Sequence, residues 1–481
     1  MALTPLIVAI VRQSVPPRRA FFLGLLTGAV YFAGTLYWLV QTMTTFGGLA
    51  TAIAAFAAAM LVAYLSLFPA AFAMILARLR QSMGTRPAIL CAAPVWVATE
   101  LGRQYVWDGF PWELLGYSQV SVLPIAQLAA VTGVYGLSML LVLVSSAAAL
   151  VIVERGSRRW MIAAAVAVLI VACAAWGRAR MADASLEVGA DPIRVAVVQG
   201  NVLQVDKWNP RLRDAIIGRY IGMTHQAIEQ GATFILWPES SMPVNFDEDP
   251  IRAGPIRRMA RESGVTLLIG SDQEERVRPD APPGDPSNRL YNAAFAVKPD
   301  GTVGAVYRKM HLVPFGEYVP LQRLLFFVGP IVEAVSSFTP GDTPVLLPVG
   351  THRASTAICY EVIYGNLIRQ FVNDGSELLT TITNDAWYGW TSAAYQHWDQ
   401  ARMRAIENGR YLARAANTGI SGFVDPYGRV LDKSALFEQR LIVRDIKFLR
   451  TRTIYSRVGD LVAWLSLVFT TGALLVSWRM R

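Results

Sequence analysis

Long apolar runs at both ends of this chain restrict its fold more than any other feature. Hydrophobic residues crowd into Ala2 to Trp176 and again into Leu461 to Trp478, whereas Asp191 to Arg457 has the charges, glycines and prolines of a globular domain. With 53% hydrophobic and only 16% charged residues, the chain is too apolar for an ordinary soluble protein. We therefore expect a multi-pass α-helical membrane bundle, one globular domain and a closing span.

The composition shifts predict a transmembrane helical bundle over residues 1–180, a globular domain over 191–447 and a C-terminal transmembrane helix over 458–481. A bilayer needs roughly 20 apolar residues per helix. The candidate spans are Phe21 to Val40, Leu49 to Ala77, Pro87 to Leu101, Leu123 to Val153, Trp160 to Trp176 and Leu461 to Trp478. Ala2 to Val11 is too short to span, so we expect a half-length helix there or a start site further upstream.

Arginine clusters beside these spans predict the topology. They lie at Arg12 to Arg19, Arg78 to Arg86, Glu154 to Arg159 and Arg479 to Arg481, and all face the cytoplasm only if Pro87 to Leu101 spans. The globular domain then lies outside, which in a bacterium is the periplasmic side of the inner membrane. The clusters carry a charge of +10, which leaves the rest of the chain near −1 of the net +9, so the basic excess reflects topology and we expect no nucleic-acid partner.

The predicted outer loop from Gly102 to Val122 is rich in aromatic residues. We interpret them as an interfacial belt, with a lipid-binding surface as the alternative. Glu100 lies near the outer end of a predicted span. We expect it to pair with Arg103 at i,i+3 spacing, and a functional intramembrane carboxylate is the alternative.

Strand-like and helix-like segments alternate through the globular domain, which predicts an α/β fold layered on a sheet. The expected strands are Ile193 to Gln199, Phe234 to Trp237, Thr266 to Gly270, Ala354 to Ile358 and Leu378 to Thr383. Asn292 to Lys298 and Thr302 to Arg308 are expected to form a hairpin around Pro299 to Gly301. The expected helices are Leu212 to Gln230, Pro255 to Ser263 and Gln396 to Ala416.

One cysteine stands at the end of a predicted strand, in the stretch RASTAICYE from Arg353 to Glu361. A thiol placed where a strand gives way to a turn is held rigidly and remains accessible to a substrate. Cys359 is therefore our candidate nucleophile, with a buried structural cysteine as the alternative. Cys91 and Cys173 lie in membrane segments, so no disulfide framework is implied.

A nucleophilic cysteine needs a base or a cationic neighbour, because its ordinary pKa of about 8.5 leaves it protonated at neutral pH. Glu239 follows a predicted strand in FILWPESSMP, and Lys309 ends a hairpin strand in YRKMHLVPFGEYVP. The ends of neighbouring strands converge in α/β sheets, so we expect Glu239, Lys309 and Cys359 to lie close together.

These three residues, in this order and in these contexts, resemble the Glu-Lys-Cys triad of the nitrilase (carbon–nitrogen hydrolase) superfamily, from about Ile193 to Asp445. The flanking spans, the string LVPFGEYVP, NDAWYG at Asn384 to Gly389 and GFPW at Gly109 to Trp112 make the whole chain similar to the apolipoprotein N-acyltransferase family. The resemblance implies a nitrilase-like α-β-β-α sandwich on the periplasmic side of the bacterial inner membrane. The family usually has eight spans, whereas this chain has six clear ones and a half-length segment.

The resemblance also implies an activity. A fatty acyl chain would pass from a membrane phospholipid, typically phosphatidylethanolamine, through a thioester on Cys359 to the N-terminal α-amine of a diacylated apolipoprotein. Glu239 would act as base, and Lys309 would stabilise the oxyanion with a backbone N–H near Tyr360. No cofactor is implied. The four histidines lack metal-ligand spacing, so we expect no metal site.

Further residues are carried over from the same resemblance. Glu317 matches the family's second glutamate and would orient Lys309, the alternative being a surface carboxylate. Tyr360 and Glu361 match the residues after the cysteine, and Glu361 would anchor the turn or contact the amine. Trp208, in VDKWNP, matches a loop tryptophan near the family's active site, although simple packing is the alternative.

The run Leu324 to Val332, LLFFVGPIV, is apolar but too short to span. We expect it to act as a lid that dips into the outer leaflet and admits acyl chains through Phe326 and Phe327, with a core element as the alternative.

Two other functions remain open from the sequence. A membrane-tethered amidase or nitrilase would share the triad and pass the acyl group to water. A transporter or receptor would use the globular domain for binding, but its spans should then carry polar residues along a pathway, and apart from Glu100 they hardly do.

Overall fold

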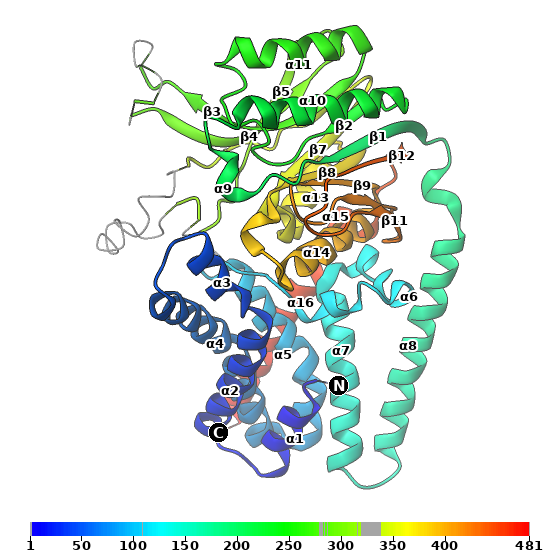
Figure 1. Ribbon diagram of the computed structural model, residues 1–481. Helices are drawn as coiled ribbons and strands as arrows, with labels where there is room; N and C mark the ends of the chain where they lie inside the picture. Colours follow the sequence, from blue (N-terminus) through cyan, green and yellow to red (C-terminus); the bar gives the residue numbers. More distant parts are fainter. Residues whose placement is uncertain are drawn as a thin grey trace. The chain divides into compact units, whose positions relative to one another are not determined.

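The computed structural model describes residues 2–107, 109–278, 282, 284–285, 287–314, 316–318 and 338–480. The chain divides into two compact units (Figure 1). The first combines Met1–Thr44, Ala50–Ala184 and Thr453–Arg481, and the second combines Thr45–Leu49 and Ser185–Arg452. The first unit is helical and the second is an α/β unit, as the sequence predicts.

The main helices of the first unit are α1 (Thr4–Arg12), α2 (Pro17–Thr35), α3 (Trp38–Thr45), α4 (Thr51–Met83), α5 (Thr85–Tyr105), α7 (Ala129–Val153), α8 (Arg158–Ala182) and α16 (Leu461–Arg479). Among the described residues, α4, α7, α8 and α16 are long and apolar enough to cross a membrane, and α2 with α3, bent by 51°, makes a fifth candidate. Helix α5 contains Pro87–Leu101 but is less apolar, so whether it spans remains a prediction.

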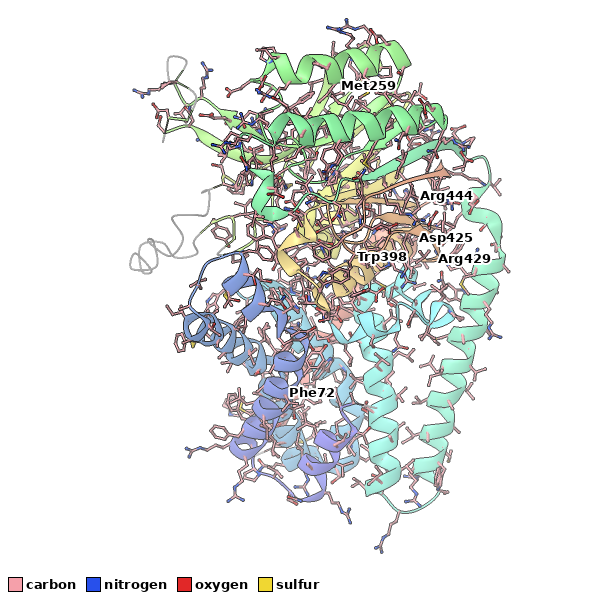
Figure 2. The ribbon with its side chains drawn as sticks, viewed as in Figure 1. Phe72, Met259, Trp398, Asp425, Arg429 and Arg444 are labelled. Atoms are coloured by element: carbon pink, nitrogen blue, oxygen red, sulfur yellow. The ribbon has the colours of Figure 1, made fainter. Side chains whose placement is uncertain are left out.

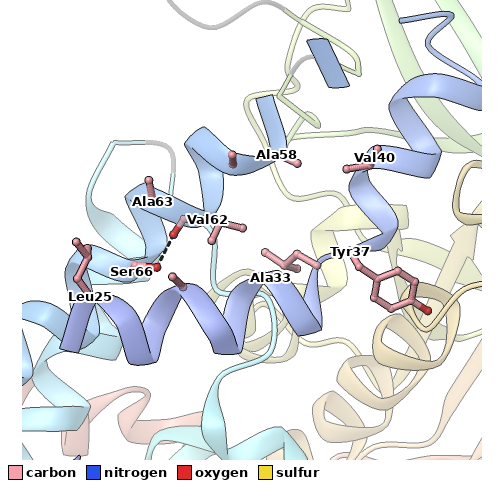
Figure 3. A pocket seen from close by; sticks show the side chains of 11 residues that line it. Leu25, Ala33, Tyr37, Val40, Ala58, Val62, Ala63 and Ser66 are labelled. Atoms are coloured by element: carbon pink, nitrogen blue, oxygen red, sulfur yellow. Dashed lines mark hydrogen bonds between the residues drawn. The ribbon is translucent and has the colours of Figure 1, made fainter. Parts of the chain in front are cut away.

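Small residues let α2 approach α4 closely. A Cβ atom on Gly24 would lie 2.4 Å from the carbonyl oxygen of Pro69, and one on Gly28 would lie 2.8 Å from the Cα of Ser66. Glycines at such crossings bring helix backbones together within membranes. Where α2, α3 and α4 diverge, they line a groove of about 420 Å³ whose walls are almost entirely apolar (Figure 3).

The expected ion pair between Glu100 and Arg103 is wrong, because none forms within the described residues. Glu100 Oε1 instead accepts the backbone N–H of Leu115 at 2.8 Å. Arg103 Nη2 donates to the carbonyl of Trp112 at 2.6 Å, and the guanidinium lies 4.8 Å from the ring centre of Phe32. Buried backbone groups of the loop need partners, and they bind the two side chains that the spacing would have paired.

The second unit contains two six-stranded sheets. The first has the order β12 (Arg440–Phe448), β1 (Asp191–Gln199), β2 (Phe234–Leu236), β3 (Thr266–Glu275), β4 (Arg289–Val297), β5 (Val303–Arg308). The second has the order β11 (Val430–Lys433), β10 (Gly422–Val424), β9 (Leu412–Ala416), β8 (Leu378–Thr383), β7 (His352–Ile358), β6 (Leu347–Val349). Neighbours β1, β2 and β3 run parallel, as do β7, β8 and β9.

Helices cover both sheets and complete an α-β-β-α sandwich. On the first sheet lie α10 (Arg213–Glu229) and α11 (Pro250–Ser263), whose apolar faces join one buried core with the strands. On the second lie α13 (Gly365–Asn373) and α14 (Ala393–Asn408). Met259 of α11 and Trp398 of α14, both labelled in Figure 2, are buried. The central residues of β1, Val195 to Val198, are wholly buried, as expected for a strand covered on both faces.

The prediction of one helix over Gln396 to Ala416 is wrong at its C-terminal end. Helix α14 ends at Asn408, because Gly409 adopts a left-handed conformation (φ +60°) that caps it. The chain then enters β9, which pairs in parallel with β8 from Leu379 onwards. The alanines of β9 favour a helix locally, but the pairing and burial of this strand override that preference.

The backbone of β3 lies against the segment that carries Glu239, which gives a prediction. A Cβ atom on Gly270 would lie 2.2 Å from the carbonyl oxygen of Pro238 and 2.7 Å from the Cα of Glu239. Gly270→Ala should therefore destabilise the protein by about 1–3 kcal/mol and slow alkylation of Cys359 by iodoacetamide. Thermal unfolding in detergent and mass spectrometry of the alkylated peptide measure both effects.

Gly254→Ala is the control. Position 254 lies inside α11 with open space around it, so alanine should stabilise the helix by about 0.5–1 kcal/mol. An unchanged melting temperature and alkylation rate in Gly270→Ala would contradict the close approach.

Candidate active site

Cys359 lies directly after β7 and begins a 3-10 turn that runs to Ile363. Its φ angle is +53°, a left-handed conformation that costs a residue with a side chain about 1–2 kcal/mol. Such strain persists only where the surroundings hold it in place, and it is concentrated at functional sites. The side chain is buried among polar neighbours, so the structure places this cysteine in a sharp, strained turn.

Glu361 stabilises that turn. Its Oε2 accepts the backbone N–H of Ile358 at 2.7 Å. Its Oε1 accepts the Tyr307 hydroxyl at 2.7 Å and the backbone N–H groups of Met310 and His311 at 2.7 and 3.1 Å. The carboxylate is wholly buried. Of the two roles expected for Glu361, the geometry favours the anchor of the turn over contact with an amine.

Glu239, Lys309 and Glu317 come together in one buried ion cluster. Lys309 Nζ lies 2.8 Å from Glu317 Oε1 and 3.4 Å from Glu239 Oε1. The side-chain amide of Asn292, on β4, donates to both carboxylates at 2.7 and 2.9 Å. Glu317 is buried and also accepts the backbone N–H of Val313 at 2.8 Å, so it is not a surface carboxylate. Its contact with Lys309 fits the expected role of orienting that side chain, which stays a prediction.

Residues that the sequence reasoning missed complete the surroundings of Glu239. The backbone N–H of Asn384, the first residue of NDAWYG, donates to Glu239 Oε2 at 2.8 Å, and this bond joins the two sheets. Lys207, which is buried, donates from Nζ to the carbonyl of Glu239 at 3.1 Å. Trp208 is 49% exposed, and Lys207 Nζ lies 5.9 Å from its ring centre. The segment VDKWNP therefore contacts Glu239 through Lys207, which directly precedes the expected Trp208.

The surroundings shift the pKa values of Glu239 and Lys309 in opposite directions. Burial raises the pKa of Glu239, but Lys309, Lys207 and the hydrogen bonds from Asn292 and Asn384 outweigh it, so the net pKa is below its ordinary value. Burial lowers the pKa of Lys309, but Glu317 and Glu239 raise it well above its ordinary value. At neutral pH the site therefore holds a carboxylate and an ammonium.

The thiol behaves in the opposite way. Burial and the charge of Glu239 raise the pKa of Cys359 well above its ordinary value, although Lys309 acts against them. The charges of both groups thus act on Cys359, which rests as a thiol at neutral pH. This arrangement lets Glu239 take the sulfur proton as the sulfur attacks, rather than beforehand. Burial also lowers the pKa of Lys207, to about 8.

Of the remaining expected residues, the structure describes Tyr360 but not the two phenylalanines. Tyr360 is buried, and its hydroxyl oxygen accepts the Tyr364 hydroxyl at 3.2 Å. Phe326 and Phe327 lie outside the described residues. Within the described part of the chain, no group of three or more histidine, cysteine, aspartate or glutamate side chains is placed to hold a metal ion.

Comparisons with known proteins cover both units. Residues 194–455 match the carbon-nitrogen hydrolase family, and residues 1–147 match the apolipoprotein N-acyltransferase N-terminal domain. An apolipoprotein N-acyltransferase of Geobacter metallireducens is 37% identical in an alignment of 472 positions that covers 96% of this chain and 88% of that protein. One of Methylococcus capsulatus is 32% identical over 92% of this chain and 85% of its own length.

Among solved structures, an amidase from Nesterenkonia sp. AN1 is 22% identical. The match covers 56% of this chain and 97% of that one, with a TM-score of 0.41.

The ion cluster generates a prediction about stability and pH. Lys309→Met leaves two buried carboxylates without their cation and should cost about 3–5 kcal/mol. In the variant the pKa of Glu239 rises above its unfolded value, so its contribution to stability is present at low pH and is lost as the pH rises through the folded pKa. The difference in melting temperature from wild type should therefore be widest near about pH 8 and narrow toward about pH 5.

Lys298→Met is the matched control, because Lys298 forms only an exposed pair with Asp300 and should contribute less than about 1 kcal/mol. Equal losses in the two variants at the higher pH would mean that the cluster does not stabilise the fold.

Proposed function

This chain belongs to the apolipoprotein N-acyltransferase family, and from that premise we propose how its residues perform the transfer. Membership assigns it to the N-acylation of lipoproteins and makes it a membrane protein. The proposed acyl donor is a membrane phospholipid, typically phosphatidylethanolamine. The proposed acceptor is the N-terminal α-amine of an S-diacylglyceryl-cysteine apolipoprotein. The overall transfer needs no cofactor, because the ester that is broken is less stable than the amide that is formed.

The observation that carries the proposal is the buried cluster of Glu239, Lys309 and Glu317, in which the charges of Glu239 and Lys309 act on the thiol of Cys359. In the first half-reaction Glu239 takes the thiol proton while the sulfur of Cys359 bonds to the ester carbonyl carbon of the donor. The resulting oxyanion forms beside the Lys309 ammonium, which two carboxylates fix in place. The ester C–O bond then breaks, and Glu239 returns the proton to the departing lysophospholipid oxygen.

The second half-reaction starts from the thioester. The neutral α-amine of the apolipoprotein attacks the thioester carbonyl, and Glu239 receives one proton from the nitrogen. The C–S bond breaks, and the proton returns to sulfur as the amide leaves. Because the first product departs before the second substrate reacts, the kinetics should be ping-pong.

Access and location follow from features outside the ion cluster. Half of the Trp208 side chain is exposed beside Lys207, which supports a role in binding substrate at the entrance to the site. The arginine clusters in the loops between spans support a cytoplasmic side for those loops and a periplasmic side for the catalytic unit in the inner membrane.

Trapping the intermediate tests the proposal. The full-length protein in detergent micelles should gain one acyl mass on Cys359 when it is incubated with phosphatidylethanolamine. It should lose that mass when a diacylated lipopeptide is added, with the appearance of an N-acylated lipopeptide. Cys359→Ala should abolish both events. Glu239→Gln should slow acylation by about 100-fold or more, because the amide cannot take the proton.

Two results would overturn the proposal. Release of free fatty acid at the same rate with and without lipopeptide would favour the tethered hydrolase. Absence of any acyl adduct on Cys359 while the lipopeptide is still acylated would remove the thioester.

A further inference from the structure

The backbone carbonyl of Cys359 has a dedicated partner on another element. His397, on α14, lies with Nε2 3.0 Å from that carbonyl oxygen, and its side chain is wholly buried. A carbonyl oxygen only accepts hydrogen bonds, so Nε2 carries the hydrogen. The turn is thus held on both sides of the strained residue, by Glu361 at the backbone N–H of Ile358 and by His397 at the backbone carbonyl of Cys359.

Two charged side chains fix the ring of His397. Arg414 Nη2, on β9, lies 2.9 Å from His397 Nδ1 and 2.9 Å from Asp385 Oδ2. Burial, followed by the charge of Arg414, lowers the pKa of His397, so the ring is neutral and Nδ1 accepts from Arg414. Asp385 Oδ1 lies beside the same nitrogen and accepts the Thr383 hydroxyl at 2.8 Å. We call His397, Asp385 and Arg414 the carbonyl clamp.

The clamp is buried and closely packed. The exposed fraction of each of the three residues is 2% or less. A Cβ atom on Gly419 would lie 2.3 Å from Asp385 Oδ2, so the backbone itself packs against the clamp. None of the three residues takes a part in the proposed acyl transfer, and a buried Asp–Arg pair is by itself weak support for stability. The clamp therefore needs another explanation, and its contact with the nucleophile's backbone provides one.

We propose that the carbonyl clamp is a positioning device that keeps Cys359 in its strained turn, aimed at the base. The segment that holds Asp385 also holds Glu239, since the backbone N–H of Asn384 donates to Glu239 Oε2. One short stretch thus positions the base directly and the nucleophile through His397. The inference rests on Cys359 being the nucleophile of the proposed function, and the clamp residues act through it without touching substrate.

The physical reason is the strain at Cys359. A residue with a side chain leaves a φ of +53° for an ordinary conformation unless its flanking peptide groups are held. Loss of the His397 bond would free the carbonyl of Cys359 while Glu361 still held the backbone N–H of Ile358. The peptide could then rotate and move the sulfur, and a displacement of about 1 Å between reacting groups can cost on the order of 100-fold in rate.

The test compares two substitutions of the same residue in the full-length protein. His397→Ala removes the donor, whereas His397→Gln places an amide N–H near the position of Nε2. The first readout is the second-order rate of Cys359 alkylation by iodoacetamide, followed by peptide mass spectrometry, which requires no lipid chemistry. The second is the split between kcat and KM for thioester formation from phosphatidylethanolamine.

We expect His397→Ala to slow alkylation by on the order of 100-fold and to lower kcat with little change in KM. His397→Gln should recover the rate to within about tenfold of wild type. Gly419→Ala, which crowds Asp385 and leaves the clamp residues unchanged, should give a smaller decrease. It provides the same test if His397→Ala does not fold.

Met259→Ala is the control for lost stability, because Met259 is buried in the core beneath α11. The proposal is overturned if His397→Gln is as slow as His397→Ala, or if the clamp variants react as fast as Met259→Ala at equal melting temperature. Normal alkylation rates in wild type without any acyl adduct would count against the proposed function and leave the clamp standing.

Discussion

One buried ammonium group, that of Lys309 between Glu239 and Glu317, sets the conditions that the rest of the catalytic unit must meet. Charges hidden from water are stable only when each has partners with good geometry. Here the partners are the Asn292 amide and the backbone N–H groups of Asn384 and Val313. They come from both sheets and from the loop after β5. The cluster can therefore form only when the two sheets are correctly paired and stacked.

The same cluster separates the charges that the chemistry needs. Lys309 keeps Glu239 ionised, while burial and the nearby carboxylate keep Cys359 protonated. Neither group can change state alone without cost, so proton transfer is coupled to the moment at which sulfur gives its electrons to a carbonyl carbon. The strained turn also holds the sulfur in place, because hydrogen bonds fix its backbone at the N–H of Ile358 and at the carbonyl of Cys359.

Turn residues and apolar runs in the sequence predicted those elements that depend on neighbouring residues in the chain. The hairpin around Pro299 to Gly301 and the strand before Cys359 are present, because turn residues and apolar runs specify them. Strand β9 was predicted as helix, since its alanines favour helix and its stability comes from pairing with β8. Strand β12 was missed, because its partner β1 lies at the other end of the domain. The i,i+3 spacing of Glu100 and Arg103 predicted an ion pair, but backbone groups of a loop further along the chain bind both side chains instead.

The candidate site divides in the same way. Residue types at the ends of strands were enough to select Glu239, Lys309 and Cys359, whereas Glu317 was selected only through the resemblance to the family. The sequence could not select Asn292, Lys207 or the backbone N–H of Asn384. Amide side chains, lysines and backbone groups occur throughout a chain, and only the folded structure shows which of them contact the site. Lys207 was adjacent to a residue of interest, yet only its burial and its bond to the Glu239 carbonyl give it a place.

The most direct measurement of the central claim is the pH dependence of Cys359 alkylation by iodoacetamide in wild type and in Glu239→Gln. If Glu239 is the base for this thiol, wild type should react near neutral pH about 100-fold or more faster than the variant. The rate of the variant should rise about tenfold per pH unit, as for a thiol of raised pKa that must first ionise in solution. Equal rates and equal pH profiles in the two proteins would contradict the account.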